Sequence, residues 1–221
     1  MIMVIEERKP GSRIACRNDA AAPSSRPMRI TKADKASNRV RIVETASRLF
    51  RERGMHSVGI ADLMKEAGFT HGGFYNHFES KEALTAEVWR TALASGNACF
   101  ADSLTHGDPD ATWKRYVTGY LSPEHRDGSE SGCVVGALVG ELAHEPAAVQ
   151  SCVVGGSEAF LAQLTGYFAR RYRLSPRNAR RRAITTWTSM LGALTLARAV
   201  VRADPGFSDE VLRVCRERLT R

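Results

Sequence analysis

Apolar residues recur along the chain at the spacing of helices, and this pattern predicts an all-α fold. In residues 60–67 the apolar side chains stand at i, i+3, i+4 and i+7, on one face of a helix. Similar stretches predict helices over residues 39–53, 80–104, 132–143, 146–173, 178–201 and 208–219, with Ser80 and Ser208 as caps, and another around Trp113 that ends before Pro123. The polar residues 122–131 predict a loop. Strand-like alternation is nearly absent, so we expect helices packed on helices.

Residues 59–78 predict two short helices joined by a tight turn. Gly68 follows the first helix, at a position that tolerates a positive φ. Thr70 stands where it can cap a second helix over 70–77. Gly72 and Gly73 each cost about 1 kcal/mol relative to alanine inside a helix. Both make sense if the backbone lies close to something large, such as the floor of a DNA groove, and the whole is the pattern of a helix-turn-helix.

The runs at residues 44–54, 60–78 and 80–84 carry a more specific resemblance. Within them, Phe-Tyr-x-His-Phe at 74–78 followed by Ser-Lys at 80–81 is more specific than helical spacing alone. With these motifs, residues 40–84 resemble the DNA-binding domain of the TetR family of transcriptional regulators. The resemblance implies a three-helix DNA-binding domain over 37–96, with its helix-turn-helix at 59–78. It also implies a helical effector-binding and dimerisation domain over 97–221.

The resemblance assigns DNA-binding roles to residues at and after the turn. The positions it implies are Thr70, His71, Gly72, Gly73, Tyr75, Asn76, His77 and Lys81. His71 occupies the slot that points into the major groove. Tyr75, His77 and Lys81 match phosphate-contacting positions, and a Tyr hydroxyl or a Lys ammonium is well suited to that contact.

Alternatives remain for some of these residues. For Tyr75 and His77 the alternative role is core packing against the helix over 39–53. For Phe74 and Phe78 we expect core packing. Gly59 stands where relatives commonly place a Ser or Thr cap. Glycine is an acceptable cap, but no hydroxyl contact to phosphate is expected there.

Residues 1–36 show no sustained periodicity and are interrupted by Pro, Gly and Ser, so we expect a disordered basic arm. Met28 begins a segment that looks like an ordinary start for the family, and we expect it to be the initiator. Between Arg26 and Arg53 there are nine basic residues and three acidic ones. A solvated, solubilising arm is one interpretation. Because the helix-turn-helix is adjacent, we favour an arm that touches phosphates.

The C-terminal half has the features of an effector-binding and dimerisation domain. Small-molecule pockets are apolar with few polar anchors, and the candidate wall residues are Trp113, Tyr116, Tyr120, Cys133, Phe160 and Trp187. Core filling is an equal alternative for any single aromatic residue. In the family, paired helices form the dimer, which implies contacts through Phe160, Leu164, Phe168, Trp187, Leu191 and Leu194. Two-fold symmetry would set two reading helices about one DNA turn apart on a palindromic operator.

Composition adds modest constraints. The 221 residues include 32 Lys and Arg against 24 Asp and Glu, a net charge of +8. This balance favours a polyanionic partner, although seven arginines between 170 and 182, expected at a solvated end, contribute to it. Five cysteines without a CxxC pair predict reduced thiols in a cytoplasm. Electrophile sensing by Cys133 or Cys152 is the alternative to buried structural thiols. No apolar leader or membrane segment is expected.

The sequence offers no catalytic constellation. Residues 71–74 resemble a lipase oxyanion loop and 155–159 a nucleophile elbow. That triad needs a histidine after the serine, but all six histidines precede Ser157. Metal and nucleotide motifs are absent, so we expect neither a cofactor nor an enzyme. The expected function is a homodimeric repressor that a small-molecule effector releases from double-stranded operator DNA. The alternative is a constitutive dimeric DNA-binding protein without an effector.

Overall fold

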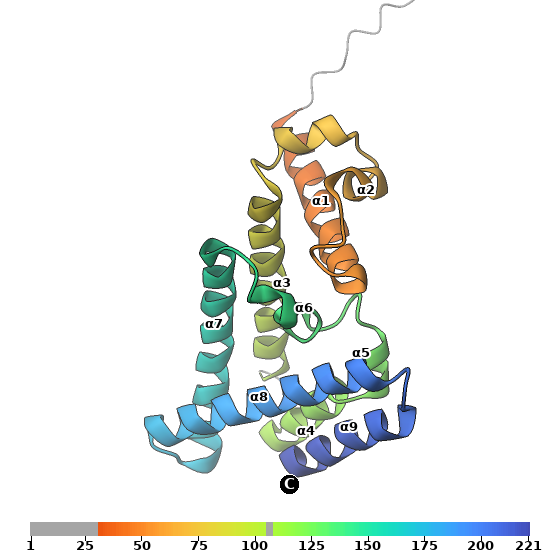
Figure 1. Ribbon diagram of the computed structural model, residues 1–221. Helices are drawn as coiled ribbons and strands as arrows, with labels where there is room; N and C mark the ends of the chain where they lie inside the picture. The colour runs from red at the N-terminus through yellow and green to blue at the C-terminus, as the bar shows by residue number, and fades with distance from the viewer. Residues whose placement is uncertain (1–30, 105–107) are drawn as a thin grey trace, which may run out of the picture. The chain divides into compact units, whose positions relative to one another are not determined.

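The structure is a computed structural model that describes residues 31–104 and 108–221, and within these ranges it is helical without strands. Its elements are α1 (Lys32–Arg53), α2 (Ile60–Glu66), the 3-10 helix η1 (His71–Asn76), α3 (Lys81–Ser103), α4 (Pro109–Tyr120), α5 (Pro123–Asp127), α6 (Val134–Leu142), α7 (Ala147–Tyr172), α8 (Pro176–Val200) and α9 (Pro205–Thr220) (Figure 1). The predicted all-α fold is confirmed. The expectations for residues 1–30, including Met28 as initiator, lie outside the described residues.

The first core joins α1, α2, η1 and the start of α3. The apolar face of α1 buries Ile42, Ala46 and Phe50, which pack with the inner residues of α2 and with Phe74 of η1. Burial of a large apolar side chain such as Ile42 or Phe50 stabilises the folded state by about 1.5–3 kcal/mol. These contacts hold the short elements in place, because a helix of only seven residues is not stable alone.

The second core lies among α4, α7, α8 and α9. It is rich in aromatic residues, and Phe100, Trp113 and Phe168 are buried in it. Helix α3 joins the two cores, since Trp89 belongs to the first and Phe100 to the second. The predicted domain boundary between residues 96 and 97 therefore falls inside an unbroken helix. In Figure 1, α8 and α9 run side by side, with α7 crossing one end of α8.

Helix caps agree with the sequence at one predicted position and differ at another. Ser80 caps α3 by accepting a hydrogen bond from the backbone N–H of Ala83 at 3.2 Å. Ser208 does not cap α9. That helix begins earlier, and the Asp204 carboxylate caps it through the N–H of Phe207 at 2.9 Å. Ser208 is instead buried, and its hydroxyl donates to the Ala197 carbonyl at 2.9 Å, which fixes α9 against α8.

Three local expectations are wrong. Residues 32–36 are not disordered but form the first turns of α1, where Ala33 and Ala36 favour a helix and Asp34 lies at its positive end. The second helix of the helix-turn-helix is a 3-10 helix, and the Thr70 side chain makes no cap hydrogen bond. Two adjacent glycines in six residues leave little to favour the α form there. The expected loop at 122–131 contains α5, which Ser122 caps.

Candidate functional site

The turn between α2 and η1 is made by one glycine. Gly68 has φ of +80°, and its N–H donates to the Lys65 carbonyl at 3.1 Å. The N–H of Phe69 donates to the Met64 carbonyl at 2.8 Å, so both carbonyls at the end of α2 are satisfied. The predicted positive φ at Gly68 is confirmed, and it sends the chain directly into residues 70–77, called here the reading segment.

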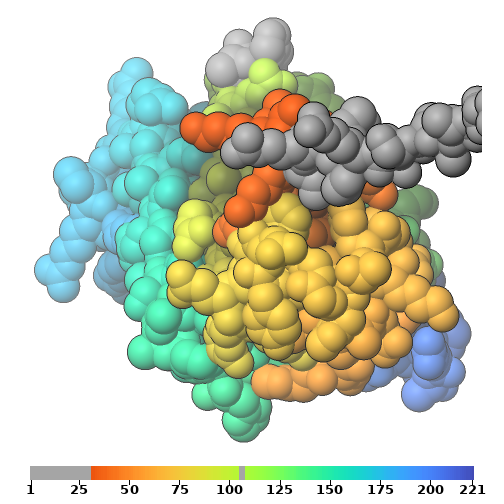
Figure 2. Space-filling view, turned by 90° about the horizontal axis from the view of Figure 1, so that it is seen from above, coloured from red at the N-terminus to blue at the C-terminus, as the bar shows by residue number. Residues whose placement is uncertain are grey.

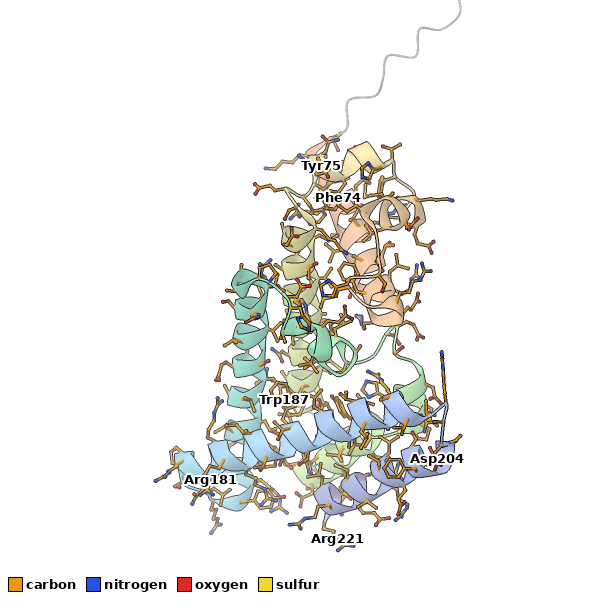
Figure 3. The ribbon with its side chains drawn as sticks, in the orientation of Figure 1. Phe74, Tyr75, Arg181, Trp187, Asp204 and Arg221 are labelled. Carbon is orange, nitrogen blue, oxygen red and sulfur yellow. The ribbon has the colours of Figure 1, made fainter. Side chains whose placement is uncertain are left out.

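Two phenylalanines anchor the reading segment in the core. Phe74 is fully buried and Phe78 nearly so, and their rings stack with centroids 5.6 Å apart. Between them Tyr75 is 61% exposed. Figure 3 shows Phe74 and Tyr75 at the same end of the described helices. Predicted core packing of both phenylalanines is confirmed, whereas the alternative of core packing for Tyr75 is wrong.

Most of the other residues of the reading segment are exposed. Thr70, His71, Gly72 and Asn76 are exposed, and His71 meets Tyr75 edge-on with ring centroids 6.3 Å apart. Figure 2 looks onto this end, where the orange and yellow residues of α2 and η1 face the viewer. Polar side chains are thus presented on a short helix whose phenylalanine anchors point inward.

Gly72 is not required by packing within the described protein. A Cβ atom at this position would meet no atom within 4 Å, and the φ angle is not positive. At Gly73 a Cβ would lie 3.5 Å from the Thr70 hydroxyl and 3.7 Å from the Met64 methyl, which are ordinary contacts. The space over Gly72 is therefore available to a body that approaches the backbone from outside.

His77 is half-buried and differs from its exposed neighbours. Its Nδ1 atom is buried without a hydrogen-bond partner among the described residues. Burial lowers the pKa of His77, and the nearby positive charges of Lys35 and Arg39 lower it further. The ring is consequently neutral at pH 7 and donates one hydrogen bond rather than two.

Lys81 is tied to the protein. Its Nζ atom donates to the Met55 carbonyl at 2.7 Å and lies 6.0 Å from the centre of the Phe50 ring. An ammonium has three hydrogen-bond donors, so two remain for another acceptor. The hydrogen bond to Met55 fixes the direction in which those donors point.

Arg39 holds α1 against the reading segment, a contact that no local pattern in the sequence predicts. Its Nε atom donates to the Glu87 carboxylate at 3.0 Å, and its guanidinium also donates to the His77 carbonyl. The guanidinium lies 4.0 Å from the centre of the Phe78 ring. These contacts join α1, α3 and the end of the reading segment through one side chain.

Other basic residues of α1 are also engaged within the protein. Arg41 donates to the carbonyl at the end of α2 at 2.9 Å and stacks 4.9 Å from the Phe69 ring. Arg48 pairs with two carboxylates. Lys32 and Lys35 lie exposed at the start of α1. The basic stretch is thus divided between residues that fix α1 in place and residues that face solvent.

A cavity of about 670 Å³ lies between the two cores. Five of the six residues expected to form a pocket line it: Tyr116, Tyr120, Cys133, Phe160 and Trp187. The last of these, labelled in Figure 3, comes from α8. Trp113 does not line the cavity, because it is buried in the second core and its Nε1 donates to the Leu219 carbonyl at 2.9 Å.

One end of the cavity is polar and centred on His125. Its Nδ1 donates to the Tyr120 carbonyl at 2.7 Å, while its Nε2 accepts from the Cys133 N–H at 3.0 Å. Burial lowers the pKa of His125, the hydrogen bond to Tyr120 raises it, and the Arg198 guanidinium lowers it. The hydrogen bonds require the neutral ring, because Nε2 must remain an acceptor. His125 thereby positions the residue that begins α6.

Sequence reasoning missed two further groups at this end. Arg51 from the last turn of α1 lines the cavity, and Arg198 from α8 packs behind Gly132. In the sequence, Arg51 is one of many basic residues and has no feature that marks it. His125 lies in the expected loop at 122–131, where no pattern distinguishes it. No spacing in the sequence connects these positions.

The expected dimer contacts need correction. Phe160, Leu164, Phe168 and Leu194 are buried within this chain, so they are not available to a partner. Trp187 and Leu191 are half-buried against its core. The exposed large apolar side chains of the C-terminal helices are instead Val154 on α7 and, on α8 and α9, Ile184, Leu196, Phe207 and Val214. The amphipathic pattern marked the inward face of the helices and not the outward one.

The turn, the anchored reading segment and the surrounding helices define a helix-turn-helix protein. The family model described as bacterial regulatory proteins, tetR family, matches residues 42–88, so this part of the chain is similar to that family. The match covers α1 from Ile42 onward, the reading segment and the first turns of α3.

Two transcriptional repressors are similar to part of the chain. The chain is 31% identical over 102 residues to the HTH-type transcriptional repressor KstR2 of Rhodococcus jostii, covering 46% of this chain and 49% of that protein. It is 31% identical over 106 residues to the HTH-type transcriptional repressor DhaR of a Mycobacterium species. This match covers 47% of this chain and 52% of DhaR. The chain thus spans about half the length of these curated relatives.

Solved structures extend the likeness to nearly the whole described fold. Reduced Escherichia coli NemR matches with a TM-score of 0.71 over 83% of this chain and 95% of that one, at 22% identity. A TetR-family regulator from Agrobacterium tumefaciens matches with a TM-score of 0.69 at 23% identity. This match covers 85% of this chain and 100% of that one. At these identities the likeness concerns the fold alone.

Two further features bear on chemistry. None of the helices in the part of the chain that the structure describes is both long and apolar enough to cross a membrane. In residues 31–104 and 108–221, no three His, Cys, Asp or Glu side chains are grouped to hold a metal ion.

Proposed function

We propose that this protein is a sequence-specific, DNA-binding transcriptional regulator, and a repressor that a small molecule releases from its operator. The observation that carries the proposal is the reading segment, in which Phe74 and Phe78 are buried while Thr70, His71, Tyr75 and Asn76 project outward. A rigid exposed helical turn of this size is suited to the major groove. The proposed role is binding in the cytoplasm rather than catalysis.

The roles of individual residues follow from their positions. His71 at the start of η1 is proposed to meet base edges, and Tyr75 and Asn76 to meet bases or phosphates. Gly72 leaves room for the DNA backbone, since nothing within the protein fills that space. The exposed Lys32 and Lys35 are proposed to contact phosphates, which would add salt-dependent affinity without sequence preference.

The active form is proposed to be a homodimer on a palindromic operator. The exposed apolar side chains of α8 and α9 support this, since Ile184, Leu196, Phe207 and Val214 would be buried by a second copy. An isologous interface of this kind generates two-fold symmetry. Two reading segments would then contact two half-sites related by the same symmetry.

The cavity supports an effector. Its volume of about 670 Å³ is within the range of about 300–1,000 Å³ usual for small-molecule sites. A constitutive DNA-binding protein has no need of such a pocket, so its presence favours the regulated form over that alternative. Among the relatives, KstR2 and DhaR carry the name of transcriptional repressors, and the same role is proposed here.

Fluorescence anisotropy on DNA from the region upstream of the gene tests the proposal, beside a shuffled fragment and across a salt series. We expect tight binding that prefers the native fragment and weakens with salt. Equal weak binding to both fragments would point to an architectural protein, and absence of binding at low salt would overturn the proposal.

Two variants separate the roles within the site. His71→Ala is expected to reduce the preference for the native fragment by about tenfold, the loss of one base contact. Lys81→Ala is expected to weaken binding to the native and the shuffled fragment alike. Arg213→Ala, on the exposed face of α9, is the control and should change neither. A change only of sequence preference in Lys81→Ala would show that its role is misassigned.

A further inference from the structure

Two arginines at the polar end of the cavity lack acidic partners. Arg51 donates to the Ser47 hydroxyl at 2.9 Å and to the Glu130 carbonyl at 3.3 Å, while its Nε is buried without a partner. Arg198 donates to the carbonyls of residues 125 and 126 at 2.7 and 3.1 Å, and its Nη1 is buried without a partner. Within the described residues, neither guanidinium forms a salt bridge.

The surrounding backbone makes room for these groups. A Cβ at Gly132 would lie 2.8 Å from Nη2 of Arg198, and one at Gly136 would lie 3.3 Å from its Nη1. Two glycines therefore allow the guanidinium of Arg198 to lie against the backbone beside Cys133. Larger residues at these positions would displace it.

Electrostatics at this end favour an anion. Burial lowers the pKa of Arg51, and the positive charge of Arg198 lowers it further. Burial likewise lowers the pKa of Arg198. Cys133 raises the pKa of both arginines in part, and the exposed Glu130 raises it least. Glu124 also lines the cavity, but it forms no salt bridge with either arginine. Buried charges without counterions are costly, and a bound anion would relieve that cost.

Away from the polar end, four aromatic residues line the cavity together with aliphatic and small polar ones such as Leu93, Asn97 and Ser157. Tyr116, Tyr120, Phe160 and Trp187 form its walls, and Phe160 and Trp187 lie 5.8 Å apart between ring centroids. The Tyr120 hydroxyl is buried without a partner among the described residues. Burial raises the pKa of Tyr120 well above its ordinary value, so the hydroxyl remains a proton donor. Flat apolar walls with donors at one end suit a planar apolar molecule with an acceptor at one end.

We infer that the effector is an aromatic monoanion, whose anionic group binds Arg51 beside Arg198 and whose rings lie among Tyr116, Tyr120, Phe160 and Trp187. This rests on the proposed function. It also specifies the regulation, because Arg51 belongs to α1, the helix whose other turns pack on the reading segment. An anion that attracts Arg51 shifts α1 directly, so the signal from the cavity to the reading segment does not have to pass through α3 alone.

The first test compares naphthoate with its neutral amide, naphthamide, by isothermal titration calorimetry on the intact protein. The two probes share the same rings and differ in charge. We expect naphthoate to bind at least about tenfold more tightly, as a charge-assisted hydrogen bond requires. Equal affinity, a preference for naphthamide, or no binding of either probe would overturn the inference. This test needs no variant, so it does not depend on a variant's folding.

Variants then locate the anion. Arg51→Gln is expected to weaken naphthoate binding about tenfold and to leave naphthamide binding unchanged. Arg48→Gln, on the same helix but paired with carboxylates, is the matched control and should bind both probes like the parent. Unchanged naphthoate binding in a folded Arg51→Gln would place the anion elsewhere and overturn the assignment.

The regulatory part is measured by adding naphthoate to the protein–DNA complex. Release of the parent protein from the native fragment, with Arg51→Gln at least about tenfold less sensitive, is the expected result. Naphthoate that binds through Arg51 without changing DNA affinity would overturn the regulatory part. If the protein binds DNA but not naphthoate, the inference fails and the proposed function stands. If it binds naphthoate but never DNA, the proposed function fails and the assigned ligand class stands.

Discussion

The reading segment and the cavity use aromatic residues in opposite ways. In the reading segment, Phe74 fills the core completely and its neighbour Tyr75 stands in solvent. Around the cavity, Tyr116 and Tyr120 are largely buried but border a space that no side chain fills. A surface for a large rigid partner is made by anchoring a short element firmly. A site for a small molecule is made by leaving part of the core unfilled.

The polar groups of the two regions differ in the same sense. The polar side chains of Thr70 and His71 face water and need no partner within the protein. At the cavity, polar atoms of Arg51, Tyr120 and Arg198 are buried without partners among the described residues. Such atoms weaken the folded state unless something binds them. The comparison therefore predicts a stable reading segment beside a cavity region that a ligand stabilises.

The largest effect is expected from removing the anchor. Phe74→Ala should lower the free energy of unfolding by about 3–5 kcal/mol, because it deletes a fully buried ring from the first core. Tyr75→Ala, one residue further on, should change it by less than about 0.5 kcal/mol, since that ring is mostly exposed. Urea unfolding monitored by circular dichroism measures both. Similar losses in the two variants would show that the anchor is shared by both rings.

A glycine at the contact between α3 and α7 gives the next effect. A Cβ at Gly156 would lie 2.6 Å from Cδ1 and 2.7 Å from Cβ of Leu93, and the Gly156 carbonyl accepts from Asn97 at 3.0 Å. Gly156→Ala is therefore expected to destabilise the protein by about 1–3 kcal/mol, despite the better helix propensity of alanine. A stabilised variant in the same unfolding experiment would mean that the two helices can separate without loss.

How far the sequence predicts these regions depends on the distance between the interacting residues. The positive φ of Gly68 and the inward Phe74 follow from local spacing, and the structure confirms both. Pocket aromatics were predictable as a group, although Trp113 fills core instead. The link between Arg39 and Glu87 spans 48 positions, and that between Arg51 and the Glu130 carbonyl spans 79. No local pattern encodes such pairs, because they depend on how whole helices pack.

The cavity itself permits a stabilising substitution. Gly96 lies in the middle of α3 and lines the cavity, and a Cβ there would meet no atom within 4 Å. Gly96→Ala should raise the free energy of unfolding by about 0.8 kcal/mol, the difference in helix propensity without a clash. Its contrast with Gly156→Ala isolates the effect of packing, since both glycines are central in long helices. Thermal unfolding of the two variants provides the measurement. A lower free energy of unfolding in Gly96→Ala would mean that the added methyl group clashes with a neighbour and that the space beside Gly96 is filled.

The smallest effect concerns pH and the polar end of the cavity. Because burial lowers the pKa of His125 below its ordinary value of 6.5, the unfolded chain takes up a proton before the folded one does. The stability held by the neutral ring is therefore complete above pH 6.5 and is lost as the pH falls through the folded pKa. The loss should be below about 1 kcal/mol per pH unit, since the ring is only partly buried and one proton sets a limit near 1.4.

His125→Gln tests this, because glutamine retains an acceptor for the Cys133 N–H but takes up no proton. Urea unfolding at pH 7.5 and 5.5 gives the free energy of unfolding at each pH. The difference between the two values should be smaller in the variant than in the parent. His77, whose pKa burial also lowers, accounts for the difference that remains. An anion bound at Arg51 should favour protonation of the nearby ring, so naphthoate should reduce the pH dependence of the parent. An equal pH dependence in parent and variant would show that the polar end of the cavity is open to water, unlike the core beneath the reading segment.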